Sequence, residues 1–164
     1  WTAASTMPAI AISSGQIASP QKGFLAPDFS LDTLDGGVIT LSALRGRVVV
    51  INLWASWCPP CRAEMPALQM AHEDFTDQGL VVLGVNMTYQ DSQAEASSFA
   101  SEMGLTFPIA FDHIGEIARL YRMRALPTTY FIDPEGIIRE VIVGGSLNEA
   151  TIRSVVTDLL KESN

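Results

Sequence analysis

The sequence predicts an α/β domain in which a mixed central sheet carries helices on both faces and a β-hairpin is added at the N-terminal side. Two apolar runs rich in β-branched residues, 47–54 and 79–87, are typical of strands buried on both faces. Segments with the apolar spacing of helices follow them. Near the C-terminus two strands follow one another across a tight turn, which indicates an antiparallel pair.

The expected elements follow one another from residue 24 onward. They are a hairpin at 29–41, a strand at 47–54, a helix at 59–78, a strand at 79–87, a helix at 92–103, a short extended segment at 107–111, a helical segment at 114–122, strands at 128–133 and 136–143, and a helix at 147–161. Pro66 is expected to kink the first helix because it removes a hydrogen bond. Ser146 is expected to cap the last helix.

The first 23 residues differ in composition from the rest of the chain. They are rich in Ala, Ser and Pro without a clear period, so we expect a flexible arm or linker at 1–23 and one domain at 24–164. The chain begins at Trp1, and we therefore expect a longer precursor with a signal peptide or membrane anchor upstream. No run of 18 apolar residues is present, so we expect no membrane contact by this chain itself.

Composition and charge exclude some classes of function. With 164 residues, 48% of them hydrophobic, the chain is long enough to bury a core without disulfide staples. The net charge of −8 and the lack of a basic stripe argue against a nucleic-acid partner, because that affinity depends largely on clustered Lys and Arg. We expect a monomer.

The two cysteines of the chain, Cys58 and Cys61, predict a redox dithiol. They lie between the strand at 47–54 and the following helix, where the positive end of the helix dipole lowers the pKa of a thiol. We expect Cys58 to attack a disulfide, because it precedes the helix and should be the more exposed, and Cys61 to resolve the mixed disulfide. Pro59 and Pro60 carry no N–H to stabilise the Cys58 thiolate, which favours a moderate pKa and a reducing poise.

Two alternative roles of the cysteine pair are less favoured by the sequence. A structural disulfide closing so short a loop yields little stabilisation and is labile. Half of a zinc site needs further ligands, and only His72 and His113 could supply them. His72 falls on the apolar face of its helix and His113 lies in a separate segment, so we expect structural roles for both. No metal or other cofactor is expected.

Three motifs together resemble the TlpA, ResA and CcmG type of thioredoxin-fold proteins. Segment 50–66 reads VINLWASWCPPCRAEMP and is similar to the active site of that family. Segment 126–133, LPTTYFID, resembles its cis-proline loop and the following strand. Segment 26–29, APDF, followed by a hairpin, resembles the N-terminal entry of this branch. The resemblance covers about residues 24–161 and implies a thioredoxin-like three-layer sandwich.

The resemblance also implies a surface for the substrate. Pro127 is expected to be a cis-proline, which is a rare and specific feature. Leu126 would pair with an extended substrate chain in the manner of a β-strand. Trp57 would cover the edge of the site. The residues expected to bind substrate are Trp57, Pro59, Pro60, Leu126 and Pro127, with Thr128 in support.

Two departures from the family bear on proton transfer. Asn52 stands where thioredoxins have a buried Asp that helps to deprotonate the resolving cysteine, and an Asn cannot accept that proton. Some ResA-like proteins carry a Glu shortly after the second buried strand, where this chain reads Met-Thr-Tyr-Gln-Asp. Asp91 or Glu95 could reach the site from that loop, although we expect solvated helix-cap roles. Glu64 matches the family's Glu-x-Pro, and helix stabilisation near the N-terminus is the alternative.

From this resemblance we expect a thiol–disulfide oxidoreductase that reduces disulfides in exported proteins, with apocytochrome c as one candidate client. It implies an extracytoplasmic location with an N-terminal tether, and a membrane thiol carrier as electron donor. A disulfide oxidant is the first alternative. A thiol peroxidase shares the A-P-D-F pattern but has Thr where Ala55 stands here. A copper-binding assembly factor typically needs C-x-x-x-C and a distal His.

Overall fold

A five-stranded mixed sheet forms the centre of the computed structural model, which describes residues 17–145 and 147–163. The strand order is β5-β4-β3-β6-β7. The pairs β3–β4 and β4–β5 are parallel, whereas β6 runs antiparallel to both β3 and β7. The strands are β3 (Val48–Trp54), β4 (Leu80–Asn86), β5 (Ile109–Phe111), β6 (Thr128–Ile132) and β7 (Ile138–Val143). This arrangement confirms the mixed sheet expected from the sequence.

Strand β3 occupies the middle of the sheet, and all seven of its residues are buried. Its continuous apolar sequence suits this position, because both faces of the strand are covered and both edges are paired. In the register of the sheet, Asn52 lies between Gly84 of β4 and Thr129 of β6. The residues after Trp54 therefore lie at the carboxyl end of this central strand, where helix α1 begins.

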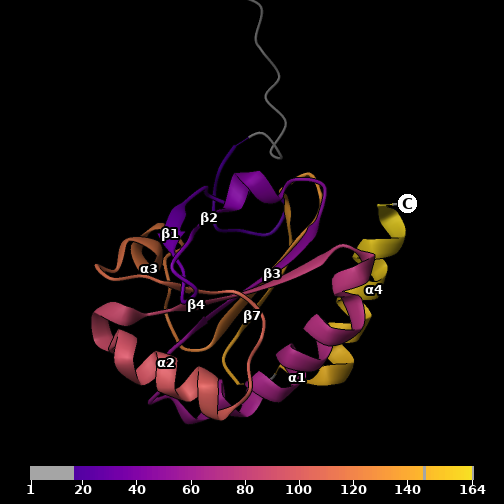
Figure 1. Cartoon of the computed structure of the whole chain (residues 1–164). Coiled ribbons are helices and arrows are strands. Elements are labelled where there is room, and N and C mark those ends of the chain that lie inside the picture. The colour runs from indigo at the N-terminus through magenta and orange to yellow at the C-terminus, as the bar shows by residue number, and fades with distance from the viewer. Residues whose placement is uncertain (1–16, 146, 164) are drawn as a thin grey trace, which may run out of the picture.

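Three helices cover one face of the sheet, and the hairpin and one short helix cover the other (Figure 1). The helices α1 (Pro59–Phe75), α2 (Gln93–Glu102) and α4 (Glu149–Glu162) contribute to one hydrophobic cluster. The short helix α3 (Glu116–Leu120) and strand β1 (Ser30–Asp32) contribute to a second cluster on the other face. Strand β1 pairs with β2 (Val38–Thr40), which confirms the added N-terminal hairpin.

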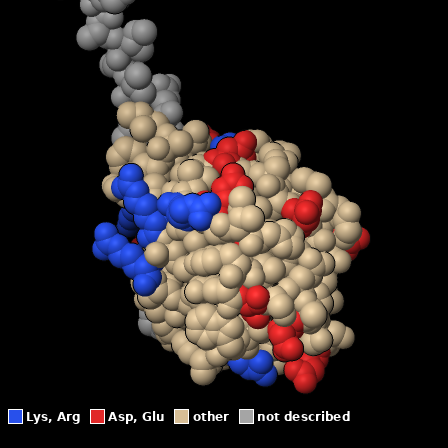
Figure 2. Space-filling model, turned by 90° about the vertical axis from the view of Figure 1, so that its left-hand side faces the viewer, with Lys and Arg blue, Asp and Glu red and all other residues tan. Residues whose placement is uncertain are grey.

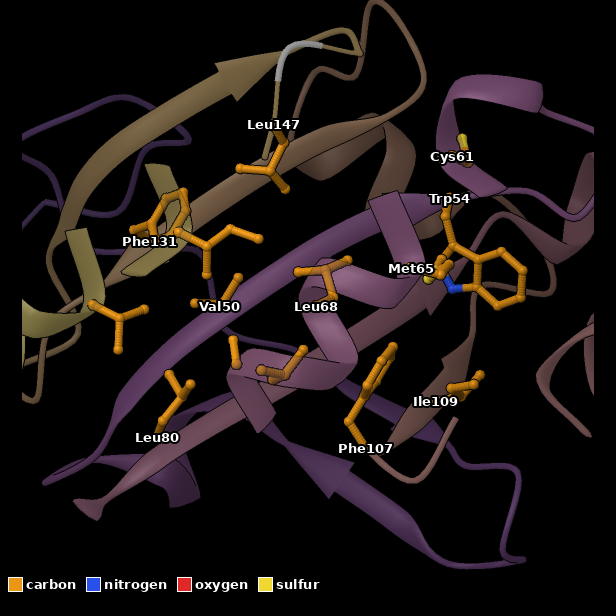
Figure 3. Close-up of a cluster of buried hydrophobic side chains, with 14 of the residues drawn as sticks. Val50, Trp54, Cys61, Met65, Leu68, Leu80, Phe107, Ile109, Phe131 and Leu147 are labelled. Atoms are coloured by element: carbon orange, nitrogen blue, oxygen red, sulfur yellow. The ribbon is translucent and has the colours of Figure 1, made fainter. Parts of the chain in front are cut away.

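The first cluster includes both cysteines. Figure 3 shows Cys61 at one end of the cluster, near Trp54 and Met65. Trp54 is fully buried, and its ring centroid lies 5.5 Å from that of Phe99 in α2. Gly84 makes room for this indole, because a Cβ at that position would lie 3.1 Å from the Trp54 Nε1 atom and 3.0 Å from the Phe107 ring. Close packing of this kind makes the floor of the site rigid.

The segment before the hairpin lies against strand β7. The Gly23 amide donates a hydrogen bond to the Ile138 carbonyl over 2.8 Å, and Leu25 pairs with Ile137. Residues 17–23 of the expected arm therefore contact the domain. Residues 1–16 lie outside the described residues, so the boundary at residue 23 stays a prediction.

The ends of several elements differ from those expected. Helix α4 begins at Glu149, and its N-cap is Asn148, whose side chain accepts a hydrogen bond from the Thr151 amide. The expected cap, Ser146, lies outside the described residues. Helix α3 is shorter than the expected 114–122, because its first turn starts after Gly115. Across residues 17–145 and 147–163, none of the helices has the length and apolar character needed to cross a membrane.

Candidate redox site

Cys58 is the N-cap of helix α1, and Cys61 lies in the first turn. The two form a disulfide, with their Cα atoms 5.2 Å apart. The Cys61 amide donates a hydrogen bond to the Cys58 sulfur over 3.3 Å. Pro59 and Pro60 occupy the first two helical positions and have no N–H, so the Cys61 amide is the donor that the first turn offers to Cys58.

The exposure of the site residues differs in part from expectation. Cys58 is 3% exposed and Cys61 is not exposed at all, so in the disulfide form the residue expected to attack is almost as well covered as its partner. Trp57 is 56% exposed, in keeping with a place at the edge of the site. Its indole N–H donates to the Gln90 carbonyl over 2.9 Å, which orients the ring.

The peptide bond between Leu126 and Pro127 is cis, as the sequence motif predicts. Pro127 is buried and Leu126 is half-buried. The loop is held on both sides, since the Thr128 hydroxyl donates to the Ala125 carbonyl over 2.7 Å and the Gly144 amide donates to the Pro127 carbonyl over 2.8 Å. Thr128 is therefore a buried residue that fixes the shape of this loop.

The loop after β7 also reaches the cysteine motif, which the sequence reasoning did not anticipate. A Cβ at Gly145 would lie 2.9 Å from the Cβ atom of Pro60, so a larger residue would push this loop away. Pro59 and Pro60 are exposed. Gly144 is hydrogen-bonded to Pro127 and Gly145 lies close to Pro60, so these residues form one surface.

Asp91 holds the backbone that leads into the cysteine motif. Its carboxylate accepts hydrogen bonds from the Ser56 amide and hydroxyl, each over 2.7 Å, and from the Asn86 side chain over 2.9 Å. Burial alone raises the pKa of this carboxyl, but the hydrogen bonds outweigh that effect and lower the pKa below its ordinary value. The expected helix-cap role is wrong for Asp91, because Ser92 caps α2.

The carbonyl of Ser56 is held from the other side by Arg62. This guanidinium donates to the Ser56 carbonyl over 3.2 Å and lies 4.5 Å from the centroid of the Phe99 ring. Asp91 and Arg62 therefore fix all the polar groups of Ser56, and we call this arrangement the Ser56 clamp. Glu95 lies in the first turn of α2, where its amide donates to the Ser92 hydroxyl.

Glu64 lies one helical turn after Cys61, and it is 2% exposed. Its carboxylate accepts a hydrogen bond from the Asn52 side chain over 3.3 Å, and the same amide group donates to the Thr129 hydroxyl over 2.9 Å. The alternative role for Glu64, helix stabilisation near the N-terminus, stays a prediction. Asn52 occupies the expected buried position and connects β6 with the Glu64 carboxyl.

Burial raises the pKa of Glu64 from 4.5 to about 7, and the hydrogen bond from Asn52 with a smaller contribution from the Leu147 backbone offsets part of that rise. Near neutral pH this carboxyl can therefore both accept and release a proton. The position of Glu64 in the sequence indicates that it lies near Cys61. A residue three positions after Cys61 lies on the same helix face as Cys61, Met65 and Leu68.

The two histidines have local structural partners. The His72 ring lies edge-on to Phe107, and its Nδ1 atom lies 3.0 Å from the Thr76 hydroxyl. The His113 ring lies beside Phe111. Within the described parts of the chain, no three His, Cys, Asp or Glu side chains come together as candidate metal ligands.

Comparisons with known proteins show which family this chain resembles. The model of the AhpC/TSA family matches residues 23–141. A thiol-disulfide oxidoreductase ResA of Oceanobacillus iheyensis is 36% identical over 146 residues, which span 87% of this chain and 74% of that protein.

Solved structures show the same likeness. The protein of Chlorobium tepidum assigned as thiol:disulfide interchange protein DsbE superimposes with a TM-score of 0.79 at 32% identity, covering 85% of this chain and 98% of that one. The exposed lipoprotein thioredoxin Etrx1 of Streptococcus pneumoniae gives a TM-score of 0.70 at 29% identity and covers 81% and 100%. The chain therefore belongs to the AhpC/TSA family and, within its thioredoxin-like fold, to the ResA type of thiol–disulfide oxidoreductases.

Proposed function

We propose that this oxidoreductase reduces disulfides in exported proteins, with Cys58 as the attacking thiol and Cys61 as the resolving thiol. The observation that carries the proposal is the position of Cys58 at the N-cap of α1, with the Cys61 amide directed at its sulfur. The dipole and this donor both favour the thiolate over the thiol.

The reaction would proceed through two exchanges. The Cys58 thiolate attacks one sulfur of a substrate disulfide, the substrate S–S bond breaks, and its second sulfur leaves as a thiolate that takes up a proton. Cys61, once deprotonated, attacks the Cys58 sulfur and releases the first substrate thiol. The substrate gains two electrons and two protons, and the chain is left with the Cys58–Cys61 disulfide that the structure contains. An external dithiol must then reduce that disulfide.

Glu64 is the proposed proton acceptor for Cys61. It lies one turn away on the same helix face, it is buried, and its pKa of about 7 allows it to take a proton near neutral pH. The amide of Asn52 orients the carboxyl without itself accepting a proton. Glu64 would thus accept the proton that a buried Asp accepts in thioredoxins, where this chain has Asn52.

The reducing direction is supported by the two prolines of the motif. Strongly oxidising dithiols owe their potential to a reduced form with a well-stabilised thiolate. Here Pro59 and Pro60 remove two amide donors from the first turn, and the Arg62 amide donates to the Cys58 carbonyl. Cys58 thus receives one amide donor from the helix, which favours a higher thiol pKa and a more reducing pair.

The substrate would lie across the loop at Leu126 and Pro127 and against Trp57, Pro59 and Pro60. Leu126 is half-buried on the loop, and Trp57 offers an exposed apolar ring. We propose an extracytoplasmic location with an N-terminal tether and a membrane thiol carrier as donor. The S. pneumoniae relative, an exposed lipoprotein thioredoxin, supports that location. Apocytochrome c is one candidate client.

The reduction potential of the Cys58–Cys61 pair tests the direction of this reaction. We expect equilibration with glutathione to give a value well below about −220 mV, whereas a value near about −120 mV would identify an oxidant. Cys58→Ser provides the blank for the fluorescence or alkylation signal, because it cannot form the disulfide.

A further inference from the structure

We propose that a basic hollow beside the cis-proline loop, formed around Arg122 and Arg124, selects acidic segments in the disulfide partner. The inference rests on the proposed function, since it specifies which partner chains reach that loop. The hollow measures about 230 Å³ and is lined by both arginines, by Pro20 and Gln21 of the N-terminal segment, by Tyr121 and Tyr130, and by Thr128 and Val143 at its end nearest the site.

The hollow continues the surface on which a substrate would lie. Thr128 follows Pro127 directly, and Val143 pairs with Thr128 and precedes Gly144, whose amide holds the Pro127 carbonyl. Arg124 precedes Leu126 by two residues, a span of at most about 7 Å along the chain. A partner strand paired with Leu126 would therefore pass Arg124 within about two residues of its contact with Leu126.

The two arginines are free to bind an acidic group. Both are exposed, and among the residues that the structure describes neither takes part in an ion pair. By contrast, Arg139 and Arg153 are paired with carboxylates. Figure 2 shows basic side chains gathered in one area on the α3 side of the molecule, in a chain whose net charge is −8. The hollow is on this side, because Tyr121 and Tyr130 belong to the cluster beneath α3.

The backbone at Arg122 gives an independent reason to assign it a function. Its φ angle is +50°, in the left-handed region that favours glycine, and it follows the C-terminal end of α3, where glycine is the usual residue. An arginine there is held against its backbone preference, and such residues are concentrated at functional sites. The unfavourable conformation places a second positive charge beside Arg124.

A carboxylate of the partner would be attracted by both guanidinium groups, and arginine suits carboxylates because its donors match the two oxygens. Local attraction of this kind raises the rate of association and falls with salt. It also opposes the overall charge of the chain. A net charge of −8 acting alone would favour basic partners, so a preference for acidic ones is diagnostic of this hollow.

The test compares the reduction of three disulfide-bridged peptides of equal length, in which the residues flanking one cysteine are acidic, neutral or basic. At low ionic strength we expect the reduced wild-type chain to have a kcat/KM for the acidic peptide about tenfold above that for the basic one, and the ratio to approach one at about 0.5 M salt. Arg122→Gly removes the charge and suits the backbone, and Arg124→Gln removes the other charge. Each should lower the ratio at least about threefold.

Arg47→Gln is the matched control, because Arg47 is exposed before the first residue of β3, at the other end of the strand from the cysteines. It changes the net charge by the same amount and should keep the wild-type ratio. The proposal is overturned if the wild type does not prefer the acidic peptide, or if the control and the two hollow variants behave alike. It is also overturned if Arg122→Gly and Arg124→Gln keep the wild-type preference among the peptides and weaken only the binding of the chain to vesicles of anionic phospholipid. Failure to reduce even the neutral peptide would instead contradict the proposed function.

Discussion

Cys58 and Cys61 are three residues apart, yet their surroundings differ in kind. The backbone before Cys58 is held at the surface by the polar groups of the Ser56 clamp, next to an exposed Trp57. Cys61 faces the interior, where the helix turn that follows it carries a buried carboxyl. The contrast teaches that the two steps of an exchange reaction need different surroundings. The attacking thiol needs a fixed position and access, whereas the resolving thiol needs a place for its proton.

The largest expected effects come from the cysteines themselves. Cys58→Ser should lower the turnover of a peptide disulfide by at least about 10³-fold, because no thiolate is left at the N-cap to attack. Cys61→Ser should also stop turnover but allow one attack per chain. Single-turnover and steady-state assays on both variants separate these outcomes. Sustained turnover by Cys61→Ser would contradict the division of roles.

A smaller but substantial effect is expected at Glu64. Glu64→Gln keeps the shape and the burial of the side chain but cannot accept a proton, so the resolving step should slow by about 10²-fold. In the wild type that step should accelerate as the pH rises through about 7, where Glu64 ionises, and the variant should lack this dependence. Stopped-flow measurement of release from the mixed disulfide reports the step.

Glu73→Gln is the control for that experiment, because Glu73 lies on the same helix but is exposed. It should leave both the rate and the pH profile unchanged. If Glu64→Gln keeps the wild-type pH profile, another group accepts the proton and the contrast between the two cysteines is wrong on this point.

The same carboxyl predicts a pH dependence of stability. The pKa of Glu64 is about 7 in the folded state against 4.5 in its ordinary range, so between these values the folded chain binds more protons than the unfolded one. The free energy of unfolding should therefore fall as pH rises through this window, by about 3 kcal/mol from this group. Chemical denaturation at several pH values should show that the wild type loses this stability relative to Glu64→Gln. A difference in the free energy of unfolding between the wild type and Glu64→Gln that stays constant across this pH range would contradict the prediction.

The smallest of these effects is expected at the clamp. Asp91→Asn retains one acceptor oxygen but loses the charge, and it should lower the free energy of unfolding by about 1–2 kcal/mol and the rate of attack by Cys58 a few-fold. The pKa of Asp91 is lowered in the folded state, so its contribution is present at neutral pH and is lost as the pH falls through that pKa. Asp77→Asn, at an exposed carboxyl, is the control. If the two variants behave alike, the Ser56 clamp contributes neither to the free energy of unfolding nor to the rate of attack by Cys58.

Much of the fold and the centre of the site follows from local signals. The apolar run of β3, the C-x-x-C spacing and the Leu-Pro-Thr-Thr motif each lie within a short segment, and each predicted its structure correctly. The N-cap of α4 is Asn148 and not the expected Ser146. Ser and Asn are both favoured N-cap residues, so the local sequence alone does not decide where the helix begins.

The remaining features of the site depend on contacts between distant segments. Asp91 meets Ser56 across 35 positions in the chain, which no local pattern reveals. Glu64 owes its raised pKa to burial against β3, so its sequence position indicated the helix face but not the environment. Gly145 is constrained by Pro60, a residue far away in the sequence. Sequence patterns therefore located the two cysteines, while tertiary packing sets the burial and the pKa of the carboxyl that we propose as proton acceptor.

Trapping of mixed disulfides distinguishes attack by Cys58 from attack by Cys61. Reduced Cys61→Ser and reduced Cys58→Ser are each mixed with a disulfide-bridged peptide, and the adducts are mapped by proteolysis and mass spectrometry. If Cys58 attacks first, a stable adduct forms rapidly at Cys58 in the first variant and little adduct forms at Cys61 in the second. An adduct that forms at Cys61 as fast as at Cys58 would contradict this order of attack.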